Sequence, residues 1–392
     1  MEMFIENVFS EVEGKQVILA GDFDASRILE RLLLVSNDHQ TALFASKLLG
    51  SYDLIVRNQF GSHVFQTLLN SIANMIDAEM KGFPPSLSNN NNQDSSDLDT
   101  LQENTPPLKV QDIVALIVKE LDGKWASYMT HIHGTFCIRS LLNLLSGSHQ
   151  QARSKKSINY NMNHNTGTKL SSKGNIGRNL LTEKGTQKLV PVSFYQLLQT
   201  LTNSLLQDAS PEIHRLSRDT TANPVLQLLV TIPQSSSKTI HAIMNQDASK
   251  DHVKDLIKDR IGSHLMEKII QSCTKSEFKT IYKTFFREDL IELSSHPFAN
   301  FVVQAIIHKV PRESYFTELV DKIEPKVEEF LFKGAKSGII VKLVDAGRQY
   351  PSSHARIVEA LLSAFHATDN DSKKNIANLV LNLRTNEVRV CR

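Results

Sequence analysis

The sequence predicts an all-α fold built from stacked helical repeats, and three observations lead to this prediction. Apolar residues recur at helical spacing along most of the 392 residues. One five-residue pattern returns at intervals of 36 to 40 residues, for example from 26 to 62 and from 223 to 263. No segment reads as a ladder of strands. A fixed period of this size is typical of a helical solenoid, whose repeats bury a continuous core only by stacking.

The recurring pattern is clearest in "HPFANFVVQAIIHKV" (296–310). At about 100° per residue, Asn300, Phe301 and Gln304 share one face of a helix, and Val302 and Val303 lie on the opposite face. One such helix alone would indicate an ordinary amphipathic helix with a polar outer face. We call the residues at i, i+1 and i+4 the triplet, with a first, a middle and a last residue.

Eight segments fit this frame, and a Gly or Ala before the triplet is expected to let packed helices approach closely. In the first copy we expect Ile28, Leu29 and Leu32 to lie beneath the triplet. Repeats 1 to 6 have the triplets Ser26, Arg27, Glu30; Ser62, His63, Gln66; Thr135, Phe136, Arg139; Asn223, Pro224, Gln227; Ser263, His264, Glu267; and Asn300, Phe301, Gln304. The two weakest copies are Gly338, Ile339, Lys342 and Asn378, Leu379, Asn382.

A second amphipathic helix is predicted about twenty residues before seven of the eight triplets, because apolar residues recur there at i, i+3, i+4 and i+7. The segments are "MFIENVFSEV" (3–12), "QTALFASKLL" (40–49), "DIVALIVKEL" (112–121), "FYQLLQTLTNSLL" (194–206), "EFKTIYKTFF" (277–286), "SYFTELVDKI" (314–323) and "ARIVEALLSAF" (355–365).

Two stretches without apolar periodicity interrupt the array. We expect repeats 1–2 at 1–80, an acidic, Asn-rich disordered insert at 81–107, repeat 3 at 108–145, a basic low-complexity insert at 146–190 and repeats 4–8 at 191–392. The second insert holds eight Lys or Arg residues and one Glu. It can attract phosphate by counterion release or serve as a solvated spacer. Since neither end of the chain shows a polar cap, the array is expected to be part of a longer one.

The repeats resemble those of the Pumilio (PUF) family over nearly the whole chain apart from the two inserts. The most specific elements are "SRILE", "GSHVFQ", "GSHLME" and "NFVVQ". The resemblance implies that the first and last triplet residues meet the Watson–Crick edge of one RNA base, while the middle residue stacks between bases. It implies a guanine pair in Ser26 with Glu30, and again in Ser263 with Glu267. It implies an adenine pair in repeat 2 and a uracil pair in repeat 6. All triplet residues of repeats 1 to 6 except Pro224, which is a poor stacker, are candidates for RNA contact, and the triplets of repeats 3 and 4 are the weakest.

Within the PUF family, large inserts and eroded triplets resemble the nucleolar members that act in small-subunit ribosome biogenesis and bind precursor 18S ribosomal RNA. The expected protein is therefore a monomeric, soluble, non-enzymatic reader of single-stranded RNA in the nucleolus, with small-subunit preribosome proteins as further partners. Two alternatives stay open. One is a cytoplasmic regulator that binds messenger RNA 3′ untranslated regions, and the other is a HEAT-like scaffold that binds proteins.

Composition and motifs exclude several classes. Net charge is only +2, too small to indicate nucleic acid by itself. Cys137, Cys273 and Cys391 are far apart in sequence and are expected to be reduced. "HIH" (131–133) lacks further ligands at metal-binding spacing, and no phosphate-binding loop or acid–base pair occurs. We therefore expect no metal, no cofactor and no catalytic residues. There is no apolar run near 20 residues.

Overall fold

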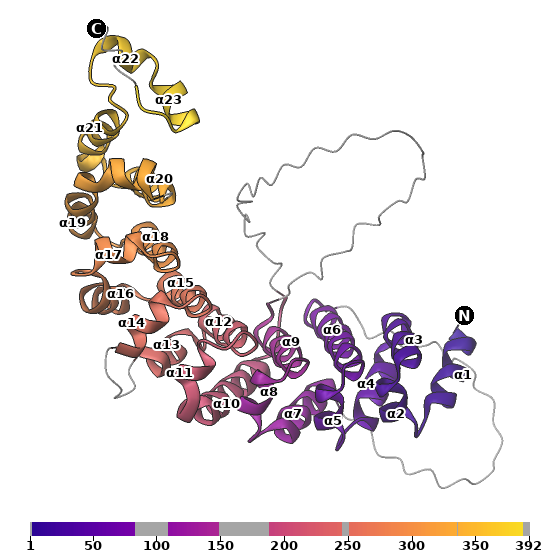
Figure 1. Ribbon diagram of the computed structural model, residues 1–392. Helices are drawn as coiled ribbons and strands as arrows, with labels where there is room; N and C mark the ends of the chain where they lie inside the picture. Colours follow the sequence, from indigo (N-terminus) through magenta and orange to yellow (C-terminus); the bar gives the residue numbers. More distant parts are fainter. Residues whose placement is uncertain (1, 83–108, 149–187, 245–250, 335, 387–392) are drawn as a thin grey trace, which may run out of the picture. The chain divides into compact units, whose positions relative to one another are not determined.

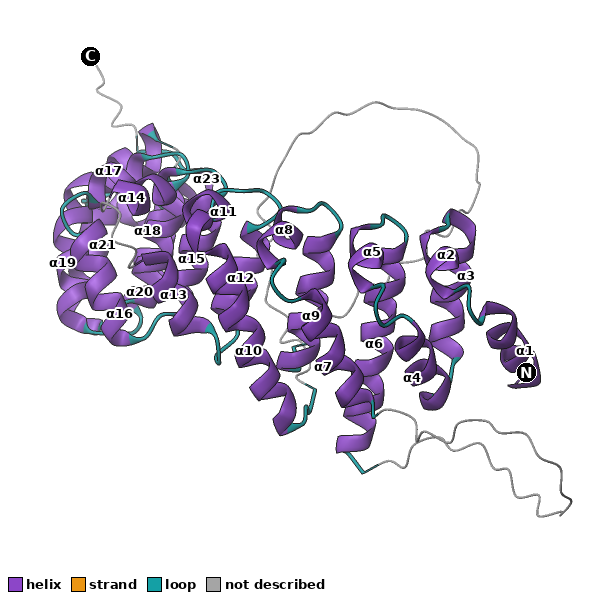
Figure 2. Ribbon diagram, turned by 90° about the horizontal axis from the view of Figure 1, so that it is seen from below, coloured by secondary structure: helices purple, strands orange, loops and turns teal. Residues whose placement is uncertain are grey.

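The computed structural model describes residues 2–82, 109–148, 188–244, 251–334 and 336–386. Two compact units are formed, the first by Met1–Leu121 with Phe136–Leu198 and the second by Asp122–Thr135 with Gln199–Arg392. Over the described ranges the regular structure is helical and contains no strand (Figure 2), which confirms the predicted fold class. Among the described helices, none combines the length and the apolar character that a membrane crossing requires.

Most repeats contain three helices, a short one lying between the two that the sequence predicts. The first helices are α1 (Glu2–Val12), α4 (Asp38–Lys47), α7 (Val110–Leu121), α10 (Val192–Ala209), α13 (Ser236–Met244), α16 (Lys275–Ile281), α19 (Glu313–Ile323) and α21 (His354–Ala364). The middle helices are α2 (Gln16–Gly21), α5 (Tyr52–Arg57), α8 (Trp125–Thr130), α11 (Ile213–Leu216), α14 (Asp251–Lys258), α17 (Leu290–Ser295) and α22 (Asn370–Lys374). Repeat 7 has a π-helical turn, Glu329–Lys333, in this place.

The third helices carry the triplets, and all eight predicted triplet segments are helical. They are α3 (Phe23–Val35), α6 (Gly61–Met80), α9 (Gly134–Ser146), α12 (Asn223–Thr231), α15 (Gly262–Ser272), α18 (Ala299–Lys309), α20 (Ser337–Gly347) and α23 (Ile376–Asn382). Within unit 1, α3 packs against α6; within unit 2, α12, α15, α18 and α20 pack in series (Figure 1). Consecutive triplets are thereby brought next to one another inside each unit.

The residues at i+2 and i+3 of the triplet frame, which we call the aliphatic pair after its usual composition, are buried in the core in repeats 2 to 6. Val64 and Phe65 of α6 are fully buried, and so are Val302 and Val303 of α18. Burial of side chains of this size contributes about 1.5–3 kcal/mol each. The periodicity that identifies the repeat is therefore the periodicity of its core.

A glycine before the triplet brings the third helix close to the middle helix of the same repeat. A Cβ atom at Gly61 would lie 2.9 Å from the Ile55 carbonyl oxygen, and one at Gly262 would lie 2.7 Å from that of Leu256. Both distances are too short for a real side chain. The close approach expected from the sequence is thus present, and it occurs within a repeat.

Two details differ from the sequence prediction. Helix α13 lies in repeat 5, where no apolar segment was identified, because hydroxyl side chains take part of its buried face: Ser236 and Thr239 are buried with Ile240 and Ile243. Ile28 is 60% exposed, whereas its counterpart Val64 is fully buried. Ile28 lines an open apolar groove that is formed by residues of α1, α2 and α3.

The expected inserts lie largely outside the described residues, but the ends of the second one belong to the fold. The Lys188 backbone N–H donates to the Gly147 carbonyl at 2.9 Å, and the Leu189 N–H donates to Asp77 of α6 at 3.3 Å. The boundary at 146–190 is therefore too wide. Residues 147 and 188 lie side by side, so a deletion confined to 149–187 needs only a short link.

Two of the three cysteines are buried thiols. Cys137 and Cys273 are 1% and 3% exposed and form no disulfide. Burial raises the pKa of Cys273 to about 11, and it raises that of Cys137 further. Both therefore stay protonated at neutral pH, as expected for structural cysteines. Cys391 lies outside the described residues.

Candidate nucleic-acid interface

The triplets of repeats 1 to 6 share one pattern of exposure. Their first residues are only 1–3% exposed, and their last residues are half-buried. The middle residue is exposed in each of these repeats except repeat 4, where Pro224 is half-buried. Phe136 and Phe301 are large apolar rings left 48% and 49% exposed at the same place in two repeats. Rings and cations presented in this way can stack on bases.

Six side chains fix the start of the third helices. Each stands four residues before the first triplet residue and accepts hydrogen bonds from the backbone N–H groups two and three residues further on. They are Asp22, Asn58, His131, Asp219, Asp259 and His296. These caps satisfy N–H groups that have no partner inside the helix. Every triplet in repeats 1 to 6 therefore stands on a fixed first turn.

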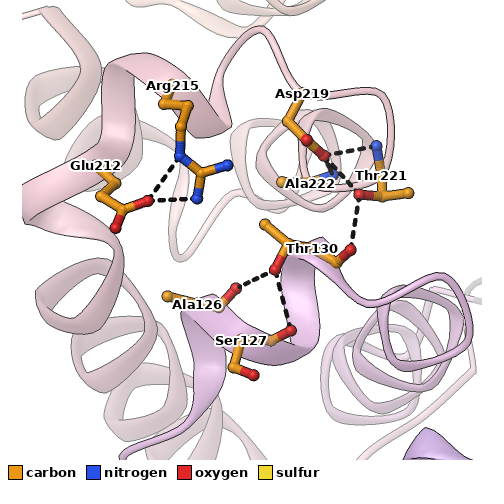
Figure 3. A network of polar contacts seen from close by, with 8 residues as sticks. All are labelled: Ala126, Ser127, Thr130, Glu212, Arg215, Asp219, Thr221 and Ala222. Atoms are coloured by element: carbon orange, nitrogen blue, oxygen red, sulfur yellow. Dashed lines mark hydrogen bonds and ion pairs between the residues drawn. The ribbon is translucent and has the colours of Figure 1, made fainter.

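Figure 3 shows the cap of repeat 4. The Oδ1 atom of Asp219 accepts from the N–H groups of Thr221 and Ala222, each at 2.9 Å. The Thr221 hydroxyl also donates to the carbonyl of Thr130 in α8 at 3.3 Å, and the Thr221 carbonyl accepts from the hydroxyl of Thr135 at 2.7 Å. The cap turn of repeat 4 is thereby tied to the end of the middle helix and the start of the triplet in repeat 3.

The first triplet residues bond to backbone instead of lying on an open face. Ser62 Oγ donates to the Gln59 carbonyl at 2.9 Å, and Ser26 and Ser263 donate to the carbonyls three residues earlier, each at 3.3 Å. Helical geometry alone places these side chains on the exposed polar face. That expectation is wrong, because the hydroxyl and amide groups of these residues point toward backbone carbonyls at the start of the third helix or just before it. A serine there keeps its oxygen lone pairs as acceptors.

Asn300 and Gln304 form a pair of fixed orientation. Asn300 Nδ2 donates to two backbone carbonyls of the preceding turn, at 2.9 and 2.8 Å, so its Oδ1 faces Gln304 and accepts from Nε2 at 3.1 Å. The Gln304 amide keeps one N–H and its carbonyl oxygen. One donor beside one acceptor is complementary to the Watson–Crick edge of uracil. Asn223 and Gln227 make the same side-chain contact in repeat 4.

Repeats 1 and 5 present carboxylates at the last position. A carboxylate has only acceptors, so it suits the two donors on the Watson–Crick edge of guanine. Burial raises the pKa of Glu267, and the nearby His264, whose Nδ1 lies 3.4 Å from Oε1, acts in the opposite direction. In repeat 1, Glu30 lies 3.5 Å from the hydroxyl of Thr67, which comes from the third helix of repeat 2.

Two arginines lie against phenylalanine rings. The guanidinium of Arg139 lies 4.6 Å from the ring centroid of Phe136, and its buried Nε has no hydrogen-bond partner among the described residues. In repeat 1, the Arg27 guanidinium lies 4.0 Å from the ring centroid of Phe23. Such cation–π contacts hold the planar group in place. Repeat 3 thus offers donors at its last position, where other repeats offer an amide or a carboxylate.

Repeats 7 and 8 lack this arrangement, and the frame predicted for repeat 7 is shifted by one residue. The frame predicted from the sequence puts Ile339 at the middle position, but Ile339 and Ile340 are both buried, 0% and 3% exposed. Burial therefore aligns Ile339 and Ile340 with the aliphatic pair, and the triplet becomes Ser337, Gly338 and Val341. In repeat 8, α23 has no buried residue.

The caps are the part of the site that sequence reasoning missed. A signal is present: an Asp, Asn or His stands four residues before the first triplet residue in each of repeats 1 to 6. The "HIH" segment (131–133) contains one of these caps. Nδ1 of His131 accepts from the N–H groups of His133 and Gly134, both at 3.2 Å, so this histidine serves as a helix cap.

A family model described as a NOP9-like PUF repeat domain matches residues 14–389. The chain belongs to this family. The match runs through both units and across the two inserts, and it confirms the resemblance seen in the repeated triplets.

Curated relatives in the family are named Nucleolar protein 9. The relative from Paracoccidioides brasiliensis (strain Pb03) is 28% identical over 243 residues, covering 59% of this chain and 32% of the relative. The one from Aspergillus clavatus is 25% identical over 252 residues, covering 62% and 34%. The chain thus spans about a third of the length of these relatives. Their name agrees with the nucleolar localisation predicted from the sequence.

Solved PUF structures share the fold. A structure of APUM23 with its insert region deleted, with GGAAUUGACGG, gives a TM-score of 0.72 at 20% identity, covering 97% of this chain and 63% of APUM23. PUF-8 in complex with PBE-RNA gives a TM-score of 0.61 at 14% identity, covering 95% and 88%. This NOP9-like chain therefore has the PUF repeat fold.

Proposed function

We propose that this NOP9-like chain binds single-stranded RNA sequence-selectively, without catalysing a reaction, through the triplets of repeats 1 to 6. The observation that carries the proposal is the recurrence of a capped helix start with an exposed stacking residue and a half-buried polar last residue. All six repeats have a short polar residue first and a polar or charged residue last, and five have an exposed ring or cation between them. Solubility alone does not require this recurrence. PUF-8 and APUM23 bind RNA on the same fold, which supports the proposal.

The order of bases follows from the polarity of binding in the PUF family, in which later repeats meet more 5′ bases. Repeat 6 is assigned U, repeat 5 G and repeat 4 U; repeat 3 is unassigned, repeat 2 is assigned A and repeat 1 G. The proposed core is 5′-UGUNAG-3′. Selectivity at each assigned base comes from the groups that the last residue has left free, such as the single N–H and the carbonyl oxygen of Gln304.

We further propose that the RNA is precursor ribosomal RNA and that the protein acts in 18S processing during small-subunit biogenesis. The name of the curated relatives supports a nucleolar role. It favours this role over regulation of messenger RNA in the cytoplasm. In-cell crosslinking with RNA sequencing distinguishes the two, because reads concentrated in 3′ untranslated regions of messenger RNA would contradict the ribosomal assignment.

Selection from a pool of randomised RNA tests the binding proposal. The chain is expected to enrich single-stranded RNA with the proposed core. A matched variant with Gln66→Ala, Glu267→Ala and Gln304→Ala is expected to lose the enriched bases while retaining its helical content. Equal pools from both proteins would contradict base reading. The absence of any enrichment would favour the HEAT-like protein-binding scaffold.

A further inference from the structure

The caps of the third helices differ in one chemical respect. Repeats 1, 2, 4 and 5 use a carboxylate or an amide oxygen, whereas repeats 3 and 6 use a histidine ring nitrogen. An amide oxygen accepts hydrogen bonds at every physiological pH. An imidazole nitrogen accepts only while it carries no proton.

His296 makes the clearer case of the two. Its Nδ1 accepts from the N–H groups of Phe298 and Ala299, both at 3.2 Å. Its backbone carbonyl accepts from the backbone N–H of Asn300 at 3.3 Å and from Asn300 Nδ2 at 2.9 Å. The residue that caps α18 therefore also fixes the first residue of the triplet. Asn300 in turn orients Gln304.

We propose that His296 is a positioning residue that makes base reading by repeat 6 depend on pH. This inference rests on the proposed function of the same triplet. When the ring is neutral, Nδ1 holds the first turn and the Asn300–Gln304 pair keeps its orientation. When the ring is protonated, Nδ1 becomes a donor that faces two other donors, and a positive charge stands at a helix N-terminus, where the macrodipole is unfavourable to it. The first turn then loses its cap.

The surroundings of His296 favour the neutral ring. Burial, Lys258 of α14 and Lys336 before α20 lower its pKa, and Glu292 of α17 acts in the opposite direction. Since an ordinary histidine has a pKa of about 6.5, the ring is neutral at pH 7.5. Because the folded-state pKa is depressed, the stability from the cap is complete above about pH 6.5 and is lost as the pH falls toward the lower folded value.

The first arm of the test needs no RNA. Nitrogen-15 shifts of the histidine rings, assigned with His296→Asn, should show the tautomer protonated on Nε2 at pH 7.5. Protonation of this ring on acidification should coincide with lost hydrogen-exchange protection at Phe298 and Ala299, measured against the intrinsic rate at each pH. Protection that does not change as the ring titrates, or a ring protonated on Nδ1 at pH 7.5, would overturn the proposal.

The second arm measures the preference for U over C at the first base of 5′-UGUAAG-3′ at pH 8 and at one pH unit below the midpoint of the His296 ring found in the first arm. The wild type should lose about fivefold, the contribution of a typical N-cap. His296→Asn should keep its preference at both pH values, since asparagine is the cap that repeat 2 already uses, and His296→Ala should be weak throughout. A wild-type preference for U over C that is as constant with pH as that of His296→Asn would overturn the inference. RNA that does not bind at any pH contradicts the proposed function instead, and the first arm then still decides whether His296 is a titrating cap.

Discussion

Repeats 6 and 7 bury the same positions of their third helices but differ in the residues of their triplets. In α18 the aliphatic pair is Val302 and Val303; in α20 it is Ile339 and Ile340, and the four residues are 0–3% exposed. The third helices of these two repeats pack directly against each other. The hydrophobic pattern is therefore preserved across a pair of repeats whose triplets have little in common.

The triplets of the same two repeats show the difference. Repeat 6 has a capped Asn300, an exposed ring and an amide with one donor and one acceptor left free. Repeat 7 has Gly338 at the middle position and Val341, 57% exposed, at the last. A Cβ atom at Gly338 would lie 2.9 Å from the amide of Gln304. The buried core and the polar triplet thus vary independently, because repeat 7 keeps the core and lacks the triplet that we propose reads a base.

The largest expected effect concerns the core that both repeats share. Ile306 in α18 and Leu343 in α20 occupy equivalent buried positions. Ile306→Ala and Leu343→Ala should each lower the free energy of unfolding by about 2–5 kcal/mol, because each leaves a cavity. Denaturant unfolding of the whole chain, compared between each variant and the wild type, measures this. A cost near zero for Leu343→Ala would show that repeat 7 is not part of the same core.

The next effect should appear in repeat 6 alone. Phe301→Ala should weaken RNA binding by about 1–3 kcal/mol through lost stacking. Its stability should stay close to that of the wild type, because the ring is 49% exposed. The matched control is Val341→Ala, which removes an exposed apolar side chain from repeat 7 and should leave RNA affinity unchanged. Equal losses in titrations of both variants would remove the distinction between the two repeats.

The base preference of repeat 5 should depend on pH through the carboxylate of Glu267. The pKa of Glu267 is raised above its ordinary value near 4.5, chiefly by burial. As the pH falls toward that raised pKa, the carboxylate gains a proton and loses an acceptor, so the preference for G at the second base should decline. Fluorescence titrations with G or A at this base, from pH 8 to pH 5, provide the measurement. Glu267→Gln cannot titrate and should prefer A throughout, and a wild-type preference for G that is constant down to pH 5 would contradict the role of the carboxylate.

The smallest expected effect comes from the basic insert, whose described ends lie side by side. Deletion of 149–187 with a short link from 148 to 188 should leave the helical content unchanged. It should reduce the slope of log K against log salt by about 0.7 for each phosphate no longer neutralised. An unchanged slope would show that the insert is a spacer. The slope thereby distinguishes a phosphate-binding insert from a solvated spacer.

The sequence predicts the fold well because one set of residues both identifies and stabilises the repeat. The positions of Val64, Phe65, Val302 and Val303 follow from periodicity alone. The middle helices were missed because α5 and α8 have six residues each, too few for a helical period to show. Helix α13 is longer and is hidden for a different reason, because its buried face includes Ser236 and Thr239.

The predicted triplet residues of repeats 1 to 6 lie at the starts of the third helices, but the geometry of their side chains could not be predicted from the sequence. Helical periodicity cannot tell that Ser62 turns its hydroxyl back to a carbonyl, because that depends on the cap turn. Nor can it reveal that the Asn300 amide donates to two backbone carbonyls and accepts from Gln304, so that Gln304 holds the polar groups left free in this pair. In repeat 7 the apolar run is long enough to allow two frames, and only burial decides between them.

The central claim is that each triplet reads one base, and Glu30→Gln tests it most directly. The change gives repeat 1 the pair Ser26 with a glutamine, which is the pair that repeat 2 already has in Ser62 and Gln66. Selection from randomised RNA should then show the 3′ base moving from G to A, with a discrimination of about 1–3 kcal/mol, and the other five positions unchanged. Glu79→Gln, an exposed glutamate at the far end of α6, is the matched control. A 3′ preference that stays at G in Glu30→Gln, or that spreads over several positions, would contradict one base per repeat.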